Sequence, residues 1–211
     1  MRSKNIRGVV SAVLFGLILP VFAQNPAVIE TSELKDFSEL ESRRRELLET
    51  AIETAKEVTG MPYLYGGNTP ADGGFDCSGA IHFILHKIGL NPPRTSSDQY
   101  LWVKKYSEIH TVSSAATSPD DHSLAQLEPG DLIFWSGTYE PNDQRQTKIT
   151  HVAIFLGYEK KDGRAVMINA TNGRSYRGKK GNGFGVYDFR IPSTASKSRI
   201  VGYGTPPGLL K

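Results

Sequence analysis

The residue best suited to do chemistry is Cys77, the only cysteine in a chain of 211 residues. It stands in the segment GGFDCSGAIHFIL, residues 73–85, where a glycine-rich loop gives way to apolar residues at helical spacing. A thiol at a helix N-terminus lies against unpaired backbone N–H groups, which favour the thiolate and can also bind an oxyanion. The segment therefore predicts a nucleophile rather than an inert buried thiol, and Gly79 is expected to leave room for a substrate backbone.

A nucleophilic thiol needs a base, and His151 is the predicted one. It opens the apolar run HVAIFLG, where a strand can hold the ring rigidly. The next apolar run, RAVMINA, contains Asn169, and a polar amide inside a buried strand must find a hydrogen-bond partner. Antiparallel pairing about a turn near Asp162 would place Asn169 beside the strand of His151, where the amide can orient the base. A local backbone cap is the alternative for this amide.

The other four histidines are weaker candidates for the base. His82 and His86 lie on the predicted helix behind the cysteine and point away from its first turn. Their spacing is that of a zinc helix, but Phe83 stands where the HExxH pattern needs a glutamate, so no metal site is predicted. His110 and His122 fall in a polar, unpatterned stretch, in which a solvated histidine is the default.

The elements that must position these residues are helices first and strands later. A capping-box pattern at Ser38–Glu41 and apolar residues at helical spacing predict a lead-in helix over 38–59, with Arg43, Arg44 and Arg45 on a solvated face. The cysteine helix is expected over 77–88. Short β-branched and aromatic runs follow at 131–135, 150–157, 164–170, 184–190 and 199–203. This order predicts an α+β fold, with the cysteine helix packed on an antiparallel sheet of about five to six strands.

The first 23 residues have a basic start, an apolar run too short to span a bilayer and a small-residue cleavage site, which predicts a secretory signal peptide. A retained membrane anchor is the alternative. Cleavage removes three of the 25 Lys and Arg and none of the 22 Asp and Glu. The remaining chain has no formal net charge and gives no reason to expect nucleic acid as a partner. We therefore expect an exported protein, periplasmic or extracellular, without stable membrane insertion, built as a linker over 24–37 and one domain over 38–211.

Five motifs occur in one order: GMPYLYGG (60–67), FDCSG (75–79), PRTSSDQ (93–99), LEPGDLIFW (127–135) and HVAIFLG (151–157). Together they resemble the NlpC-type, papain-like cell-wall peptidases, over about residues 51–203. The resemblance implies a half-papain fold, no cofactor, and cleavage of peptidoglycan stem peptides, usually between the γ-carboxyl of D-glutamate and a diamino acid. Three functions stay open: a cysteine endopeptidase, an amidase or acyltransferase on the same fold, and a non-catalytic wall-binding module.

The resemblance also implies roles for single residues. Cys77 corresponds to the nucleophile and His151 to the base, while Asn169 stands where the family more often has a second histidine. Tyr63 matches a tyrosine that borders the active site and can help bind the oxyanion. Asp76 and Ser78 match positions that often contact the N-terminal part of the substrate. Arg94, Ser96 and Gln99 match a motif that lines the groove.

Loops are where the chain departs from the family pattern. Residues 70–74 look inserted, and 104–126 and 136–149 are longer than typical; these loops are expected to border the cleft. The segment GRSYRGKK, residues 173–180, imitates a phosphate-binding loop but ends without Ser or Thr and leads into glycines instead of a helix. We expect its four cations to be solvated: Arg174, Arg177, Lys179 and Lys180. Contact with an anionic substrate or wall polymer is the alternative.

Overall fold

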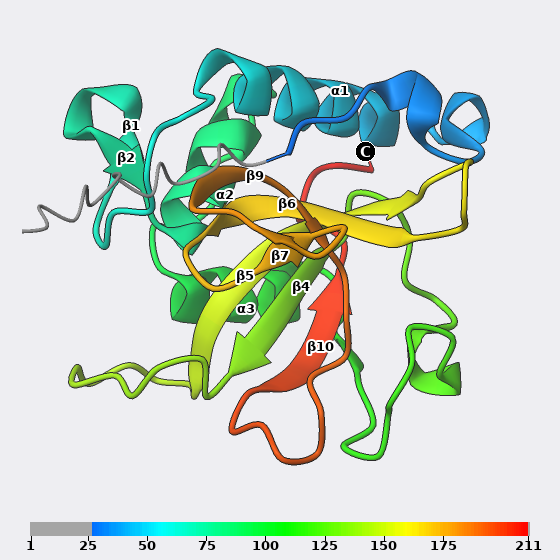
Figure 1. Cartoon of the computed structure of the whole chain (residues 1–211). Helices are drawn as coiled ribbons and strands as arrows, with labels where there is room; N and C mark the ends of the chain where they lie inside the picture. Colours follow the sequence, from blue (N-terminus) through cyan, green and yellow to red (C-terminus); the bar gives the residue numbers. More distant parts are fainter. Residues whose placement is uncertain (1–26, 211) are drawn as a thin grey trace, which may run out of the picture.

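The structure is a computed structural model that describes residues 27–210, so the predicted signal peptide and the start of the predicted linker lie outside the described residues. Within 27–210 the chain forms three α-helices and a six-stranded sheet (Figure 1). The α-helices are α1 (Ser42–Glu57), α2 (Cys77–Lys87) and α3 (Ser96–Tyr106). Short 3-10 helices are η1 (Thr31–Glu33), η2 (Phe37–Glu39), η3 (Pro70–Asp72) and η4 (His122–Leu124).

The main sheet is antiparallel and has the order β3-β10-β4-β5-β6-β9. Its strands are β3 (His110–Thr111), β4 (Leu132–Ser136), β5 (Ile149–Tyr158), β6 (Ala165–Thr171), β9 (Gly183–Asp188) and β10 (Arg199–Gly204). Two short ladders accompany it: β1 (Asn68–Thr69) with β2 (Gly74–Phe75), and β7 (Ser175–Tyr176) with β8 (Lys179–Lys180). The predicted fold class, a papain-like α+β domain with the cysteine helix on an antiparallel sheet, is confirmed.

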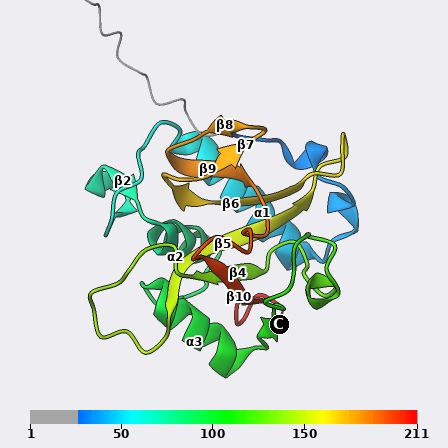
Figure 2. The same cartoon turned by 60° about the horizontal axis from the view of Figure 1, so that its bottom comes forward.

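Both faces of this sheet are buried, because side chains alternate between two apolar clusters. The helices α1, α2 and α3 pack on one face, where Val152, Ile154 and Ile168 meet them (Figures 1 and 2). Alternate residues point to the other face, where Trp135, Phe155 and Met167 lie under loop segments. His151 and Asn169 belong by alternation to this second face. The strand periodicity therefore places both polar residues on the same side of the sheet.

Helix α1 begins later than predicted. The Ser38–Glu41 pattern does not cap it; Glu41 itself is the N-cap, and its carboxylate accepts hydrogen bonds from Arg43 N and Arg44 N. The expectation that Arg44 is solvated is also wrong, since its side chain is only 5% exposed and pairs with buried Asp131 at 3.0 Å. Arg44 also donates to the Pro129 carbonyl at 2.7 Å. This buried pair ties α1 to the start of β4.

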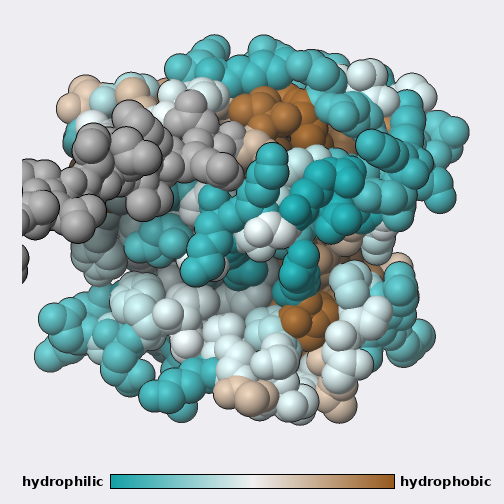
Figure 3. Space-filling model, viewed as in Figure 1, coloured by the Kyte–Doolittle hydropathy of each residue, from teal (hydrophilic) through white to brown (hydrophobic). Residues whose placement is uncertain are grey.

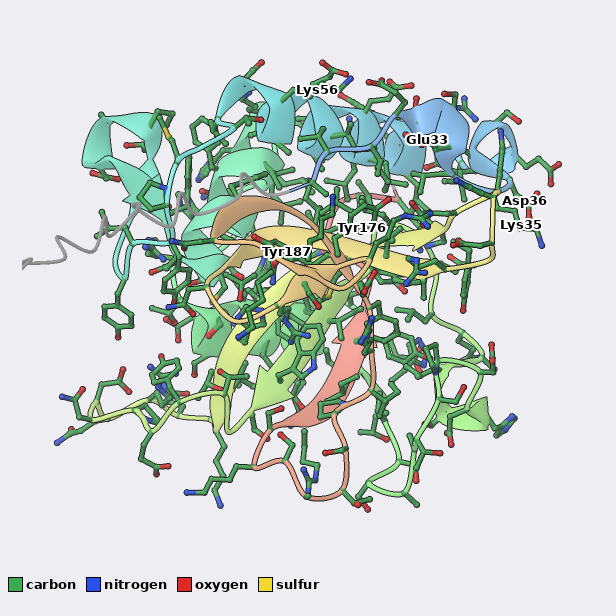
Figure 4. The ribbon with its side chains drawn as sticks, viewed as in Figure 1. Glu33, Lys35, Asp36, Lys56, Tyr176 and Tyr187 are labelled. Carbon is green, nitrogen blue, oxygen red and sulfur yellow. The ribbon has the colours of Figure 1, made fainter. Side chains whose placement is uncertain are left out.

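From residue 27 the segment before α1 contains the short helices η1 and η2, and it lies on the domain. Ile29 and Leu34 are 3% and 1% exposed. Lys35 N donates to the Tyr158 carbonyl at 2.7 Å, beside the predicted turn between β5 and β6, which the structure confirms. Figure 4 shows Glu33, Lys35 and Asp36 at the end of this hairpin. The apolar residues of the segment give it burial that a free linker would lack.

The face seen in Figure 3 is mostly hydrophilic, with hydrophobic colour below α1 at the top of the view and in a smaller patch below the centre. No helix of residues 27–210 is both long and apolar enough to cross a membrane.

Candidate active site

Cys77 is the first residue of α2, as predicted, and it is 5% exposed. Asp76 caps the helix in an extended conformation, and its carboxylate accepts a hydrogen bond from Gly79 N at 2.7 Å. The loop before the helix is held by the β1–β2 ladder and by a bridge between Tyr63 and Phe75. The thiol therefore has a fixed place at the positive end of the helix dipole.

Asp76 is the centre of a hydrogen-bond network around this helix end. Arg94 forms a bidentate pair with it, and both N–O distances are 2.9 Å. Gly66 N donates to the same carboxylate at 2.9 Å, and the Ser78 hydroxyl donates at 3.2 Å. A carboxylate has about four lone-pair sites, so these donors and Gly79 N fill it. Asp76 and Arg94 lie beside the cysteine as predicted, and their first role in the structure is to shape the loop.

Two further residues of the predicted groove motif take up different positions. Gln99 is fully buried, and its amide nitrogen donates to the carbonyls of Ser78 and Pro93 at 3.0 and 2.9 Å. It braces the cysteine helix against α3 and does not line the groove. Ser96 does line a pocket next to the cysteine. Helix α3 was not predicted from the sequence, although Thr95 is a typical N-cap residue. In the structure its hydroxyl accepts a hydrogen bond from Asp98 N.

Gly79 has a different purpose from the predicted one. A Cβ at this position would lie 2.0 Å from the Gly67 carbonyl oxygen and 3.1 Å from a nitrogen of Arg94. The space is filled by the chain's own loop, so it admits no substrate backbone. Glycine is required here because the 64–67 loop crosses the first turn of α2 in direct contact.

The structure brings His151 and Asn169 into direct contact. The amide nitrogen Nδ2 of Asn169 lies 2.6 Å from Nε2 of His151, and both residues are buried. Oδ1 of Asn169 has no partner when the amide nitrogen faces the ring. Turning the amide lets Oδ1 accept the proton of Nε2–H, which leaves Nδ1 with the lone pair that a general base needs. The predicted partnership is confirmed as a contact, and the local-cap alternative does not describe it.

The thiol of Cys77 faces the strand that carries His151, and burial shifts the pKa of both side chains towards their uncharged forms. A backbone N–H that faces the thiol belongs to Val152, the residue after His151. Burial, and then the charge of Asp76, raise the pKa of Cys77 to about 12. Burial, and then the nearby Arg174 cation, hold the pKa of His151 well below its ordinary value. At neutral pH the resting pair is therefore a thiol and a neutral imidazole.

Tyr63 borders the same site, as predicted. Its ring is half-buried, and burial, then the neighbouring Cys77 and Asp76, raise the pKa of its phenol. The phenol therefore keeps its proton at neutral pH and can donate a hydrogen bond to an oxygen that becomes negative. Its backbone N–H donates to Asn182 Oδ1 at 3.1 Å, which fixes the segment that carries the ring.

A cleft with two lobes runs past the thiol and the imidazole. The thiol lobe, of about 280 Å³, is lined by residues that include Cys77, Ser78 and Arg94. The imidazole lobe, of about 940 Å³, is lined by residues that include His151 and Arg174. Both lobes share four lining residues: Tyr63, Tyr65, Tyr139 and Thr150. They therefore form one continuous groove across the site.

The long loops divide between the groove and the opposite side. The 136–149 loop borders the groove as expected, with Tyr139 in both lobes. The expectation is wrong for 70–74 and for 104–126, neither of which contributes a lining residue to either lobe within the described chain. Leu124 from the 104–126 loop packs instead with Trp135 and Phe155 on the second face of the sheet. The apolar residues scattered through this polar stretch explain the difference.

The cations of the 173–180 segment are only partly solvated. Lys179 and Lys180 are exposed, as expected. Arg177 instead pairs with buried Glu159 at 2.7 Å. Arg174 stacks on Trp135 with 4.5 Å between the guanidinium carbon and the ring centroid. The expectation of a solvated cation is wrong for Arg174, which lies half-buried over an aromatic ring; Arg177 is exposed and also pairs with a carboxylate.

The arrangement is that of a papain-like cysteine hydrolase: a thiol at a helix N-terminus, a histidine on the adjoining sheet, and a buried amide on that histidine. Residues 60–189 match the NlpC/P60 family, and the chain belongs to that family. No group of three or more His, Cys, Asp or Glu among residues 27–210 is arranged to hold a metal ion.

Among characterised proteins, the chain is similar to the bifunctional muramidase/DL-endopeptidase CwlT of Bacillus subtilis (strain 168). It is 37% identical over 109 residues, which are 52% of this chain and 26% of that protein. Against the probable endopeptidase p60 of Listeria monocytogenes it is 33% identical over 137 residues, 64% of this chain and 22% of that protein. A gamma-D-glutamyl-L-lysine dipeptidyl-peptidase of Bacillus cereus is 32% identical over 106 residues, 50% of this chain and 25% of that protein. The chain thus spans about a quarter of these relatives.

Among solved structures, the chain is similar to the peptidoglycan hydrolase RipB of Mycobacterium tuberculosis. The TM-score is 0.46 at 24% identity, and the likeness covers 81% of this chain and 69% of that one.

Proposed function

We propose that this protein is an exported cysteine endopeptidase that hydrolyses peptidoglycan stem peptides at the bond between γ-D-glutamate and a diamino acid. The observation that carries the proposal is the buried contact of Asn169 with His151 beside the helix-terminal thiol, in a chain of the NlpC/P60 family. The relatives named as DL-endopeptidase and as gamma-D-glutamyl-L-lysine dipeptidyl-peptidase support the choice of bond.

The residues divide the work of acyl transfer as follows. The neutral imidazole of His151 takes the thiol proton of Cys77 while Sγ attacks the carbonyl carbon. Backbone N–H groups at the start of α2 and the phenol of Tyr63 donate to the oxygen as it becomes negative. His151 then gives the proton to the leaving amine, and the C–N bond breaks to leave a thioester on Cys77. A water that His151 deprotonates hydrolyses the thioester and restores the thiol.

Mass spectrometry of purified sacculi digested with the protein tests this function. We expect products split within the stem peptide after D-glutamate. Cys77→Ala and His151→Ala should release none of them, because the nucleophile or its base is missing. The matched control is His122→Ala, since His122 is exposed on η4 and lines neither lobe. It should digest sacculi at the wild-type rate.

The same digest separates the alternatives. Peptides released whole from the sugar chain would identify an amidase. New amide or ester products without net hydrolysis would identify an acyltransferase. Binding to sacculi without any product would identify a non-catalytic module. Each of these results overturns the endopeptidase proposal.

A further inference from the structure

Arg174 is a cation of the imidazole lobe whose guanidinium group has no ion-pair partner among the described residues. It follows the end of β6, is half-buried, and stacks on Trp135, which pairs with His151 across strands β4 and β5. Within the described chain no carboxylate pairs with its guanidinium group and no acceptor takes a hydrogen bond from it. Although burial lowers the pKa of Arg174 to about 10, the side chain stays charged at neutral pH.

Stacking leaves the edge of the guanidinium group free. A contact with an aromatic ring uses no hydrogen-bond acceptor, so the N–H donors of Arg174 remain available for a carboxylate. The contact with Trp135 holds the guanidinium group in place before any ligand arrives. Arg174 lines the imidazole lobe, so the free edge has access to the groove.

The backbone around Arg174 is also fixed in place. Arg174 precedes the β7–β8 hairpin, and its carbonyl accepts a hydrogen bond from Gly181 N at 3.1 Å. Tyr176 of this hairpin, labelled in Figure 4, donates to the carboxylate of buried Glu159. Arg177 N donates to Asp188 Oδ1 at 3.2 Å. These anchors hold the hairpin on the sheet and keep Arg174 beside His151.

The two lobes differ in charge. In the thiol lobe each charge has a partner, since Asp76 pairs with Arg94 and Asp143 pairs with Arg145 at 2.6 Å. The imidazole lobe contains no acidic lining residue within the described chain. Its cations are Arg174, Lys197 and Arg190, of which Arg190 pairs with Asp188 at 2.6 Å. An anionic group is therefore favoured in the imidazole lobe.

The histidine decides which half of a substrate enters that lobe. His151 must protonate the leaving amine, so the leaving half lies on the side of the imidazole and the acyl half on the side of Cys77. We propose that Arg174 binds a carboxylate of the leaving half, and that it thereby selects substrates in which this half carries one close to the scissile bond. The inference rests on the proposed function, and it concerns recognition of the half that departs.

Two carboxylates can meet this description. One is a side-chain carboxylate of the diamino acid, which diaminopimelate has and lysine lacks. The other is the free C-terminus of a short stem peptide. Synthetic stem peptides that carry diaminopimelate, its side-chain amide or lysine, each with a free or an amidated C-terminus, distinguish the two sources. If removal of one of these carboxylates abolishes the preference of the wild-type enzyme for carboxylate over amide substrates, that carboxylate is the group that Arg174 binds.

Steady-state kinetics on this set with Arg174→Gln tests the assignment. We expect a loss of kcat/KM on the order of ten- to a hundredfold on the preferred carboxylate substrate, mainly in KM, and less than about threefold on its amide. Arg174→Lys should recover part of the loss, since charge remains without the planar fork. The matched control is Lys161→Gln, an exposed cation of the β5–β6 turn, which should behave as wild type.

A binding measurement separates this inference from the proposed function. Calorimetry with Cys77→Ala protein measures the affinity for the leaving half alone, a dipeptide of diaminopimelate and D-alanine or its amides, without any chemistry. We expect Arg174→Gln in that background to weaken binding of the carboxylate form and to leave the amide forms unchanged.

Other results overturn the inference. Equal loss of kcat on carboxylate and amide substrates, with slower alkylation of Cys77, would mean that Arg174 acts on the thiolate instead. Equal affinity of Arg174→Gln and wild-type backgrounds for the dipeptide would also overturn it. A wild-type protein that cleaves no stem peptide would instead overturn the proposed function, and the calorimetry would still report on Arg174.

Discussion

Replacement of Asn169 is the sharpest test of how the site works. The amide meets Nε2 of His151 at 2.6 Å, and Asn169 is fully buried. Asn169→Ala leaves the imidazole free to turn and to carry its proton on the wrong nitrogen. The imidazolium that forms during turnover also loses a hydrogen bond, which for a charged group is worth about 1.5–3 kcal/mol. At 1.36 kcal/mol for each tenfold change, kcat should fall on the order of ten- to a hundredfold.

Two more variants at Asn169 separate orientation from charge. Asn169→His should keep substantial activity, because it can accept the Nε2 proton in the same way. Asn169→Asp puts a carboxylate beside the ring, which favours the imidazolium and raises the pKa of His151. Only neutral His151 can act as the base, so the acid limb of the pH–rate profile should move to higher pH. In the wild type this limb should lie well below pH 6.5, because burial lowers the pKa of His151.

The assay is the pH–rate profile of a fluorogenic stem peptide, with thermal melts to exclude unfolding. A folded Asn169→Ala protein with the wild-type kcat would refute the reasoning, since the amide would then be structural only. The next candidate for an orienting group is Asn172, which is exposed in the imidazole lobe. Asn172→Ala would then have to show the loss.

Arg44→Met should lower the free energy of unfolding, measured in urea, by about 3–5 kcal/mol, because Asp131 stays buried without its cation. The further change Asp131→Leu should recover part of this loss, and a single change of less than about 1 kcal/mol would contradict the account. Gly79→Ala should lower both the melting temperature and the activity, because its Cβ would lie 2.0 Å from the Gly67 carbonyl oxygen; unchanged values would show that the loop moves freely. Alkylation of Cys77 by iodoacetamide should be slow near pH 6 and rise through about pH 10, because burial raises the pKa of its thiol to about 12. A rate already constant at about pH 6 would demonstrate a thiolate–imidazolium pair instead.

The sequence was enough to predict the parts of the fold that depend on periodicity. The helix from Cys77 and the strands around His151 and Asn169 follow from apolar spacing and turn residues. The meeting of His151 with Asn169 also follows, since the turn near Asp162 sets the order of β5 and β6 and the alternation sets the face. Each of these predictions uses information that lies within one element or one hairpin.

What could not be predicted depends on contacts between distant segments. Arg44 looks like a surface residue on its helix, and only packing against the start of β4 supplies its partner 87 positions away. The sequence suggests free space at Gly79, but in the structure the 64–67 loop fills that space. The sequence suggests that Arg174 belongs to a solvated basic loop, but in the structure it lies over the ring of Trp135. The amino-acid composition of a segment does not show which of its side chains has a partner far along the chain and which are solvated.

In the proposed mechanism, the distribution of charge in the site lets a neutral resting pair be effective. Burial keeps the proton on Cys77 and keeps His151 free of one, so neither charge exists before the substrate arrives. Attack on a carbonyl moves the negative charge from sulfur to oxygen, where the helix N-terminus and the Tyr63 phenol can meet it. The positive charge appears on His151, where the amide of Asn169 is already in place. In this proposed reaction the groups that stabilise charge thus lie where charge would develop, and the resting thiol remains protonated and weakly reactive.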